Sequence, residues 1–152
     1  MAVRPRPRTG GYTLLEVLIA TAIMGTLLAI GVPRMLTLRG PYALTGAANR
    51  IAADLQVARQ RAIARNVRYR VFFSSAGSGY YQVEREASPN TFVKDSAKFV
   101  LPHEVHIGSA TPSNPIFNSR GMLTANVSLP VSVTGVGTKT VTTNVLGQTT
   151  IQ

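Results

Sequence analysis

The sequence predicts an α+β fold in which a long N-terminal helix, first transmembrane and then amphipathic, packs on an antiparallel β-sheet domain. Three observations predict this arrangement. Residues 12–32 form an apolar run that is long enough to cross a membrane as a helix. Apolar residues then recur at helical spacing at Ile51, Leu55, Ala58 and Ala62. After Asn66, short segments that alternate apolar and polar residues are bounded by Gly, Pro, Asn or Ser, as antiparallel strands are.

The composition excludes several classes of protein. The chain has 152 residues, of which 45% are hydrophobic, so it is too apolar for a disordered basic tail. It contains no cysteine, which excludes a disulfide scaffold, thiolate catalysis and a cysteine zinc site. Sixteen basic residues against six acidic ones give a charge of +10, so nucleic acid and an anionic membrane surface are both open as partners.

The first element is a basic segment followed by the apolar run. Residues 1–11 hold Arg4, Arg6 and Arg8, and the 21 residues from Tyr12 to Val32 hold one charge, Glu16. As a helix this run is about 31 Å long, enough to cross a hydrocarbon core of roughly 30 Å. An ordinary secretory signal, cut after Ala29-Ile30-Gly31, is the alternative. The length of the run and the carboxylate inside it favour a membrane helix. Three arginines precede the run and two, Arg34 and Arg39, follow it, which favours an N-terminus in the cytoplasm.

Glu16 is the candidate functional residue of this helix, because an acid inside a membrane is costly without a partner. Cleavage between Gly11 and Tyr12 would create a partner, since Tyr12 would then carry a free α-amino group four residues before Glu16. The alternative is that Glu16 reaches to the lipid headgroups.

The motif Gly11-Tyr12-Thr13-Leu14-Leu15-Glu16-Val17 resembles the class III signal of type IV prepilins and type II secretion pseudopilins, G-F-T-L-x-E, with Tyr12 in place of Phe. The resemblance extends to Gly25 and Pro33. It implies cleavage after Gly11 by a prepilin peptidase and N-methylation of Tyr12. It also implies that Glu16 sets the register of assembly by meeting the N-terminal amine of a neighbouring subunit.

The next elements are a possible break and a second helical stretch. Pro33 is expected to bend or loosen the helix, and Gly40-Pro41 to interrupt it. The second stretch is expected from Tyr42 to about Arg65. The predicted strands are 69–73, 80–84, 98–101, 104–107, 116–118, 126–129, 139–144 and 148–151, with residues 87–95 as a polar connector.

The soluble part resembles the GspH/FimT branch of the pilin-like proteins. The residues that carry the resemblance are Asp54-Leu55, Ala58-Arg59, Ala62-Ile63, Arg65-Asn66, the segment 117–121, and the closing hairpin 141–151 with Asn144 and Gly147. The resemblance implies a pilin-like fold with a leader (1–11), a transmembrane helix (12–39) and a periplasmic domain (40–152). It implies a minor pilin or pseudopilin of the bacterial inner membrane. The implied partners are other subunits, the peptidase and the inner-membrane assembly platform, and the implied role is filament initiation or a tip complex.

Catalytic chemistry has little support in the sequence. His103 and His106 lack the His-Glu-x-x-His spacing of a helical metal site, and in a strand they would point to opposite faces. No phosphate loop and no nucleophile elbow is present. The sequence therefore predicts no enzyme, no cofactor and no metal.

DNA binding is the rival hypothesis. Arg61, Arg65 and Arg68 lie in a basic stripe that could contact phosphates. Some FimT-type pilins take up DNA through a G-R-x-R pattern in the closing hairpin. The matching residues, 147–150, contain no arginine, so the resemblance does not extend to that pattern.

Overall fold

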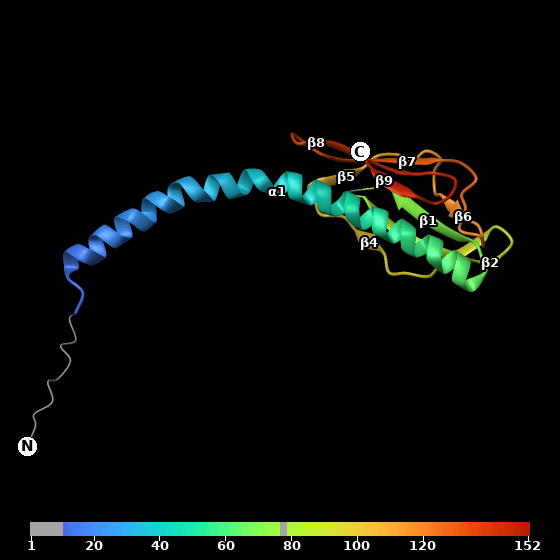
Figure 1. Ribbon diagram of the computed structural model, residues 1–152, viewed down its shortest axis with the longest axis horizontal. Coiled ribbons are helices and arrows are strands. Elements are labelled where there is room, and N and C mark those ends of the chain that lie inside the picture. The colour runs from blue at the N-terminus through green and yellow to red at the C-terminus, as the bar shows by residue number, and fades with distance from the viewer. Residues whose placement is uncertain (1–10, 77–78) are drawn as a thin grey trace, which may run out of the picture. The chain divides into compact units, whose positions relative to one another are not determined.

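The computed structural model of the chain describes residues 11–76 and 79–152, and Figure 1 shows its elements. It contains a helix of 52 residues, α1 (Leu14–Arg65). The chain divides into two compact units. Residues 1–38 are here called the N-terminal unit, and residues 39–152 are called the C-terminal unit. The helix therefore contributes its first part to the N-terminal unit and its second part to the C-terminal unit.

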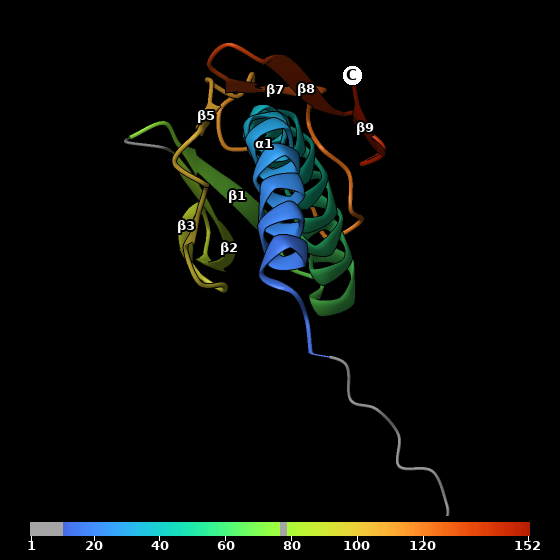
Figure 2. The same cartoon turned by 90° about the vertical axis from the view of Figure 1, so that its left-hand side faces the viewer.

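The C-terminal unit contains two antiparallel sheets. The first, here called sheet A, consists of β1 (Tyr69–Ser74), β2 (Tyr80–Ser88), β3 (Thr91–Lys94), β4 (Phe99–Val100) and β6 (Ile116–Phe117). The second, sheet B, consists of β5 (Val105–Ile107), β7 (Val127–Val133), β8 (Gly137–Thr143) and β9 (Thr149–Ile151). Figure 2 shows the two sheets on two sides of the helix. The predicted α+β fold, with a long N-terminal helix packed on antiparallel strands, is confirmed.

One face of α1 fills the space between the sheets. The predicted apolar stripe is confirmed, because Ile51, Leu55, Ala58 and Ala62 are each at most 1% exposed. The same core contains large side chains of sheet A, namely Tyr69, Tyr81 and Phe117, and the valines of sheet B. The helix thus contributes both large and small apolar side chains to the interior of the C-terminal unit.

The expected interruption at Gly40-Pro41 is wrong, because α1 continues through both residues and through Pro33. A Cβ at Gly40 would lie 2.6 Å from Cγ2 of Val136, in the turn between β7 and β8. The missing side chain thus lets this turn pack directly against the helix backbone. Here tertiary packing outweighs the local preference of Gly and Pro to end a helix.

The strands were predicted in outline, with three errors. The strand expected to end at Glu84 continues to Ser88. The connector expected at 87–95 contains a strand, β3, which pairs with the second half of β2. The strand expected to end at Leu129 continues through Pro130 to Val133. Pro130 is tolerated because it lies just beyond the last pair with β5, Ile107–Val131, so the missing amide breaks no bond to that strand.

Candidate assembly site

The start of α1 is fixed by a capping interaction. The backbone N–H of Glu16 donates to Oγ1 of Thr13 at 3.2 Å, and the N–H of Val17 donates to the carbonyl oxygen of Thr13. Thr13 therefore caps the helix, with Glu16 three residues later, which is the spacing of a capping box. Sequence reasoning missed this cap, although the T-x-x-E spacing of Thr13 and Glu16 is a signal for it. The carboxylate of Glu16 also lies at the positive end of the helix dipole.

The residues at the predicted cleavage point lie just before this cap. Gly11, Tyr12 and Thr13 are not helical, and the Tyr12 side chain is 84% exposed. A Cβ added to Gly11 would meet no atom within 4 Å, so the fold of this chain does not require glycine at that position. Residues 1–10 of the predicted leader lie outside the described residues.

The first part of α1 exposes a continuous apolar surface. Its large apolar side chains are 50–79% exposed, namely Leu14, Leu15, Val17, Leu18, Ile19, Ile23, Met24, Leu27, Leu28, Ile30 and Val32. An 18-residue window of the helix has a mean hydropathy of 2.2 and no buried residue. An exposed apolar surface of this kind marks contact with lipid or with other proteins.

The polar side chains within this surface differ in whether they have a partner inside the chain. The hydroxyls of Thr21 and Thr26 donate to helix carbonyl oxygens three or four residues earlier, so they need no outside partner. Glu16 differs from them. Within residues 11–76 and 79–152, no basic group lies within 4.0 Å of its carboxylate. Of the two acids of α1, Asp54 pairs with Arg50, whereas Glu16 has no cation within the described part of the chain.

The basic stripe at the end of α1 is paired within the C-terminal unit. One Nη of Arg61 lies 3.0 Å from Oδ2 of Asp95, and one Nη of Arg65 lies 2.7 Å from Oδ1. The Tyr69 hydroxyl donates to Oδ2 of Asp95 at 3.2 Å. Burial acts to raise the pKa of Asp95, but hydrogen bonds from Arg65 and Tyr69 outweigh it and lower that pKa.

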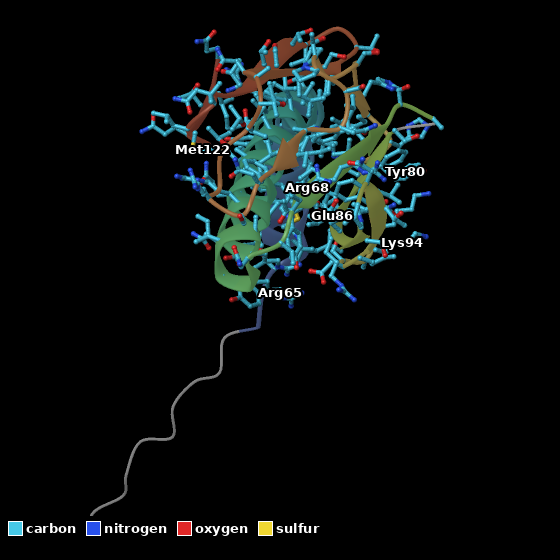
Figure 3. The ribbon with its side chains drawn as sticks, turned by 90° about the vertical axis from the view of Figure 1, so that its right-hand side faces the viewer. Arg65, Arg68, Tyr80, Glu86, Lys94 and Met122 are labelled. Atoms are coloured by element: carbon cyan, nitrogen blue, oxygen red, sulfur yellow. The ribbon has the colours of Figure 1, made fainter. Side chains whose placement is uncertain are left out.

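Arg68 is paired in the same way with a different acid. Its guanidinium donates to both carboxylate oxygens of Glu86 and to Oδ1 of Asn90, and Figure 3 shows Arg68 and Glu86 next to each other. The hydrogen bond from Arg68 lowers the pKa of Glu86 and raises that of Arg68. The structure therefore joins the three candidate DNA contacts, Arg61, Arg65 and Arg68, to carboxylates of the same chain. These ion pairs neutralise much of the positive charge that the stripe could offer to a phosphate.

Sequence reasoning missed Asp95 as the organising group of this cluster. Its arginine partners come from α1, 30 and 34 residues earlier in the chain, so no local motif marks it. The closing hairpin shows a similar long-range contact. Gln56 of α1 donates to the carbonyl oxygen of Gly147, and Arg59 donates to that of Gly121. These bonds anchor two loops on the helix.

The two histidines form no site in the described part of the chain. His106 lies in β5 and is exposed between the buried residues Val105 and Ile107, and His103 lies in the turn before that strand. Across residues 11–76 and 79–152, no group of three or more His, Cys, Asp or Glu side chains is placed to hold a metal ion.

Taken together, a capped helix with an exposed apolar first part and an α+β domain on its second part define a pilin-like subunit. Comparison with protein families agrees. Residues 6–32 match the family described as prokaryotic N-terminal methylation motif, and residues 47–147 match the family described as type II transport protein GspH. The chain belongs to the GspH family. Such proteins are minor pseudopilins or pilins of type II secretion systems or type IV pili, structural subunits rather than enzymes.

Solved structures share the fold at low sequence identity. The minor pseudopilin EpsH of the Vibrio cholerae type 2 secretion system is 12% identical, with a TM-score of 0.60, and the match covers 72% of this chain and 95% of EpsH. The type IV minor pilin FimU of Pseudomonas aeruginosa is 14% identical, with a TM-score of 0.59 over 72% of this chain and 87% of FimU. No curated protein sequence matches the chain.

Proposed function

We propose that this chain is made as a membrane-inserted precursor, is cut between Gly11 and Tyr12, and then joins a filament through the first part of α1. The observation that carries the proposal is that the first part of α1, residues 14–38, has no packing partner among the described residues. Its apolar side chains are exposed, and its one acid, Glu16, has no cation within the described residues. A methylation motif over residues 6–32 supports processing at this point and N-methylation of Tyr12.

In this proposal Glu16 sets the register between neighbouring helices. An unpaired carboxylate in hydrocarbon is costly, and an ammonium group beside it removes much of that cost. Cleavage before Tyr12 supplies an ammonium at the end of each mature chain. A neighbour docked one register away would leave both charges unpaired, so the pair acts against wrong registers more than it adds to stability.

The proposed topology has a leader at 1–11, a single transmembrane helix at 12–39 and a periplasmic domain at 40–152. In this topology the chain is held in the bacterial inner membrane until the assembly platform adds it to other pilin or pseudopilin subunits. EpsH is described as a minor pseudopilin and FimU as a minor pilin. For this chain we propose a role at filament initiation or in a tip complex. The fold alone fits a secretion pseudopilus and a type IV pilus equally.

Replacement of Glu16 by Val tests the register role. The variant should still enter the membrane and be cut after Gly11, because valine favours a membrane helix, yet it should fail to support filament assembly or secretion. Glu104→Val is the matched control, since Glu104 is exposed in the turn before β5 and outside α1. Normal assembly by Glu16→Val, or equal loss in both variants, would contradict the proposal.

A further inference from the structure

The outer face of sheet A, which is turned away from α1, has an unusual composition. Strand alternation places Tyr69 and Val71 of β1 and Val83 of β2 on the inner face, where they are buried in the core. The outer face therefore carries the residues between them. Strand register aligns these in rows across the sheet, namely Arg70–Glu84–Lys94, Phe72–Gln82 and Ser74–Tyr80–Val100, with Glu86 and Phe92 in a further row.

This face is packed and ordered rather than loosely solvated. The Arg70 guanidinium carbon lies 4.4 Å from the ring centroid of Phe92, and Nζ of Lys98 lies 3.6 Å from that of Tyr80. Beneath these groups Gln82 and Glu84 are only 7% and 6% exposed, and both Arg70 and Gln82 donate to the Glu84 carboxylate. Acidic side chains on a sheet surface that faces water are usually exposed, whereas Glu84 is buried beneath aromatic rings and cations.

The charges of the C-terminal unit are unbalanced, and the imbalance reaches this face. Residues 39–152 hold 12 basic and 5 acidic residues, a net charge of +7. Four of those acids, Asp54, Glu84, Glu86 and Asp95, already pair with arginines of the same chain. Lys94 and Lys98 are exposed, and no carboxylate in the described parts of the chain lies within 4.0 Å of either ammonium group. Figure 3 shows Tyr80 and Lys94 on the side of the sheet away from α1.

We infer that this outer face docks an acidic surface of a different protein subunit of the same filament, an inference that rests on the proposed assembly function. The partner places carboxylates against Lys94 and Lys98 and an apolar side chain on Val100, which is 60% exposed. Aromatic residues and arginine at the centre with charged residues around them are the composition of protein interfaces. A second copy of this chain fits poorly, because its C-terminal unit carries a net charge of +7 and four of its five acids already pair with arginines of the same chain.

Nucleic acid fits this surface less well, although it is also an anionic partner. Binding of single strands depends on bases that stack on open aromatic faces. Here Lys98 covers the ring of Tyr80, and Arg70 covers that of Phe92. The lysines remain open to carboxylates, whereas the rings are closed to bases.

Site-specific crosslinking in cells tests the inference on the full chain. A photo-reactive amino acid at Val100 should crosslink the processed protein to another pilin-like subunit, identified by mass spectrometry. The double charge reversal Lys94→Glu and Lys98→Glu should lower the yield of this adduct about tenfold, because like charges then face each other. The control Arg120→Glu with Lys139→Glu changes the net charge equally but lies outside the face, and should leave the yield unchanged.

The neutral pair Lys94→Gln and Lys98→Gln guards against misfolding, because a glutamate at 94 would face Glu84 across the strands. It should lower the adduct yield about threefold while the protein reaches normal membrane levels. Processed protein that gives no adduct, an adduct with nucleic acid or with a second copy, or equal loss in the control would each overturn the inference. Failure of processing at Gly11 would instead overturn the proposed function on which it rests.

Discussion

The two parts of α1 differ in where their partners lie. From Leu44 to Ala62 the helix buries an apolar face against two sheets of its own chain, and the described residues leave no buried side-chain polar atom without a hydrogen bond. From Leu14 to Val32 the apolar side chains are exposed, and Glu16 has no cation within the described residues. One helix thus serves two purposes, and substitutions in its two parts should have different consequences.

The largest difference is expected for leucine truncation. Leu55→Ala, at a position that is 1% exposed, should lower the free energy of unfolding of the C-terminal unit by about 2–5 kcal/mol, because it leaves a cavity. Leu27→Ala, at a position that is 67% exposed, should change that free energy by less than about 0.5 kcal/mol. Chemical denaturation of the full chain in detergent, followed by tyrosine fluorescence, measures both. Equal destabilisation would remove the distinction between the two parts.

Replacing a glycine by alanine should have opposite effects on stability in the hairpin between β8 and β9 and in the first part of α1. Gly147 has a φ of +77°, and a Cβ there would lie 2.7 Å from the carbonyl oxygen of Gly121. Gly147→Ala should therefore destabilise the C-terminal unit by about 1–3 kcal/mol. At Gly25 a Cβ meets no atom within 4 Å, so Gly25→Ala should stabilise the helix by about 1 kcal/mol. Thermal melts by circular dichroism measure both, and a stable Gly147→Ala variant would contradict the first expectation.

Asp95→Asn should have a moderate and pH-dependent effect. Loss of the ion pairs with Arg61 and Arg65 should cost about 1 kcal/mol, because the arginines are half exposed. The pKa of Asp95 is lowered on folding, so its stabilising effect is full above the unfolded pKa of about 3.9 and is lost as the pH falls through the folded pKa.

The difference in melting temperature between the natural chain and Asp95→Asn should accordingly be largest above about pH 5 and shrink below about pH 4. Glu104→Gln is the control, since Glu104 is exposed. A difference that grows as the pH falls would contradict the assignment of Asp95 as the charged partner.

The smallest effect is expected on DNA. Neutralising Arg61, Arg65 and Arg68 together should lower the melting temperature, because their carboxylate partners lose their cations, and should leave DNA retention unchanged. A filter-binding titration at low and high salt measures retention. Salt-sensitive binding that the triple substitution abolishes would establish these arginines as phosphate contacts instead.

The sequence predicted those features whose cause is local. The 3.6-residue period of Ile51, Leu55, Ala58 and Ala62 predicted the buried face of α1, and alternation predicted most strands. The continuity of α1 could not be predicted from Gly40-Pro41, because the packing of Val136 there comes from a turn far along the chain. Strand β3 was missed because its side chains are largely exposed at the sheet edge.

The candidate site shows the same division. The segment from Gly11 to Glu16 is a short motif, so its position could be predicted. The same residues also contain the sequence signal for the helix cap at Thr13. The ion pairs of Arg61, Arg65 and Arg68 could not be predicted from the sequence. Their carboxylate partners, Asp95 and Glu86, come close only in the folded C-terminal unit. A cluster of basic residues in a sequence therefore overstates the positive charge that is available to bind an anionic partner.

The central claim is that α1 finds its missing partners in other subunits after the chain is cut before Tyr12. Mass spectrometry of the protein extracted from membranes tests this most directly. We expect a mature chain that begins at Tyr12 and carries one methyl group on its α-amine. A chain that still begins at Met1, or one that begins beyond Val32, would contradict it.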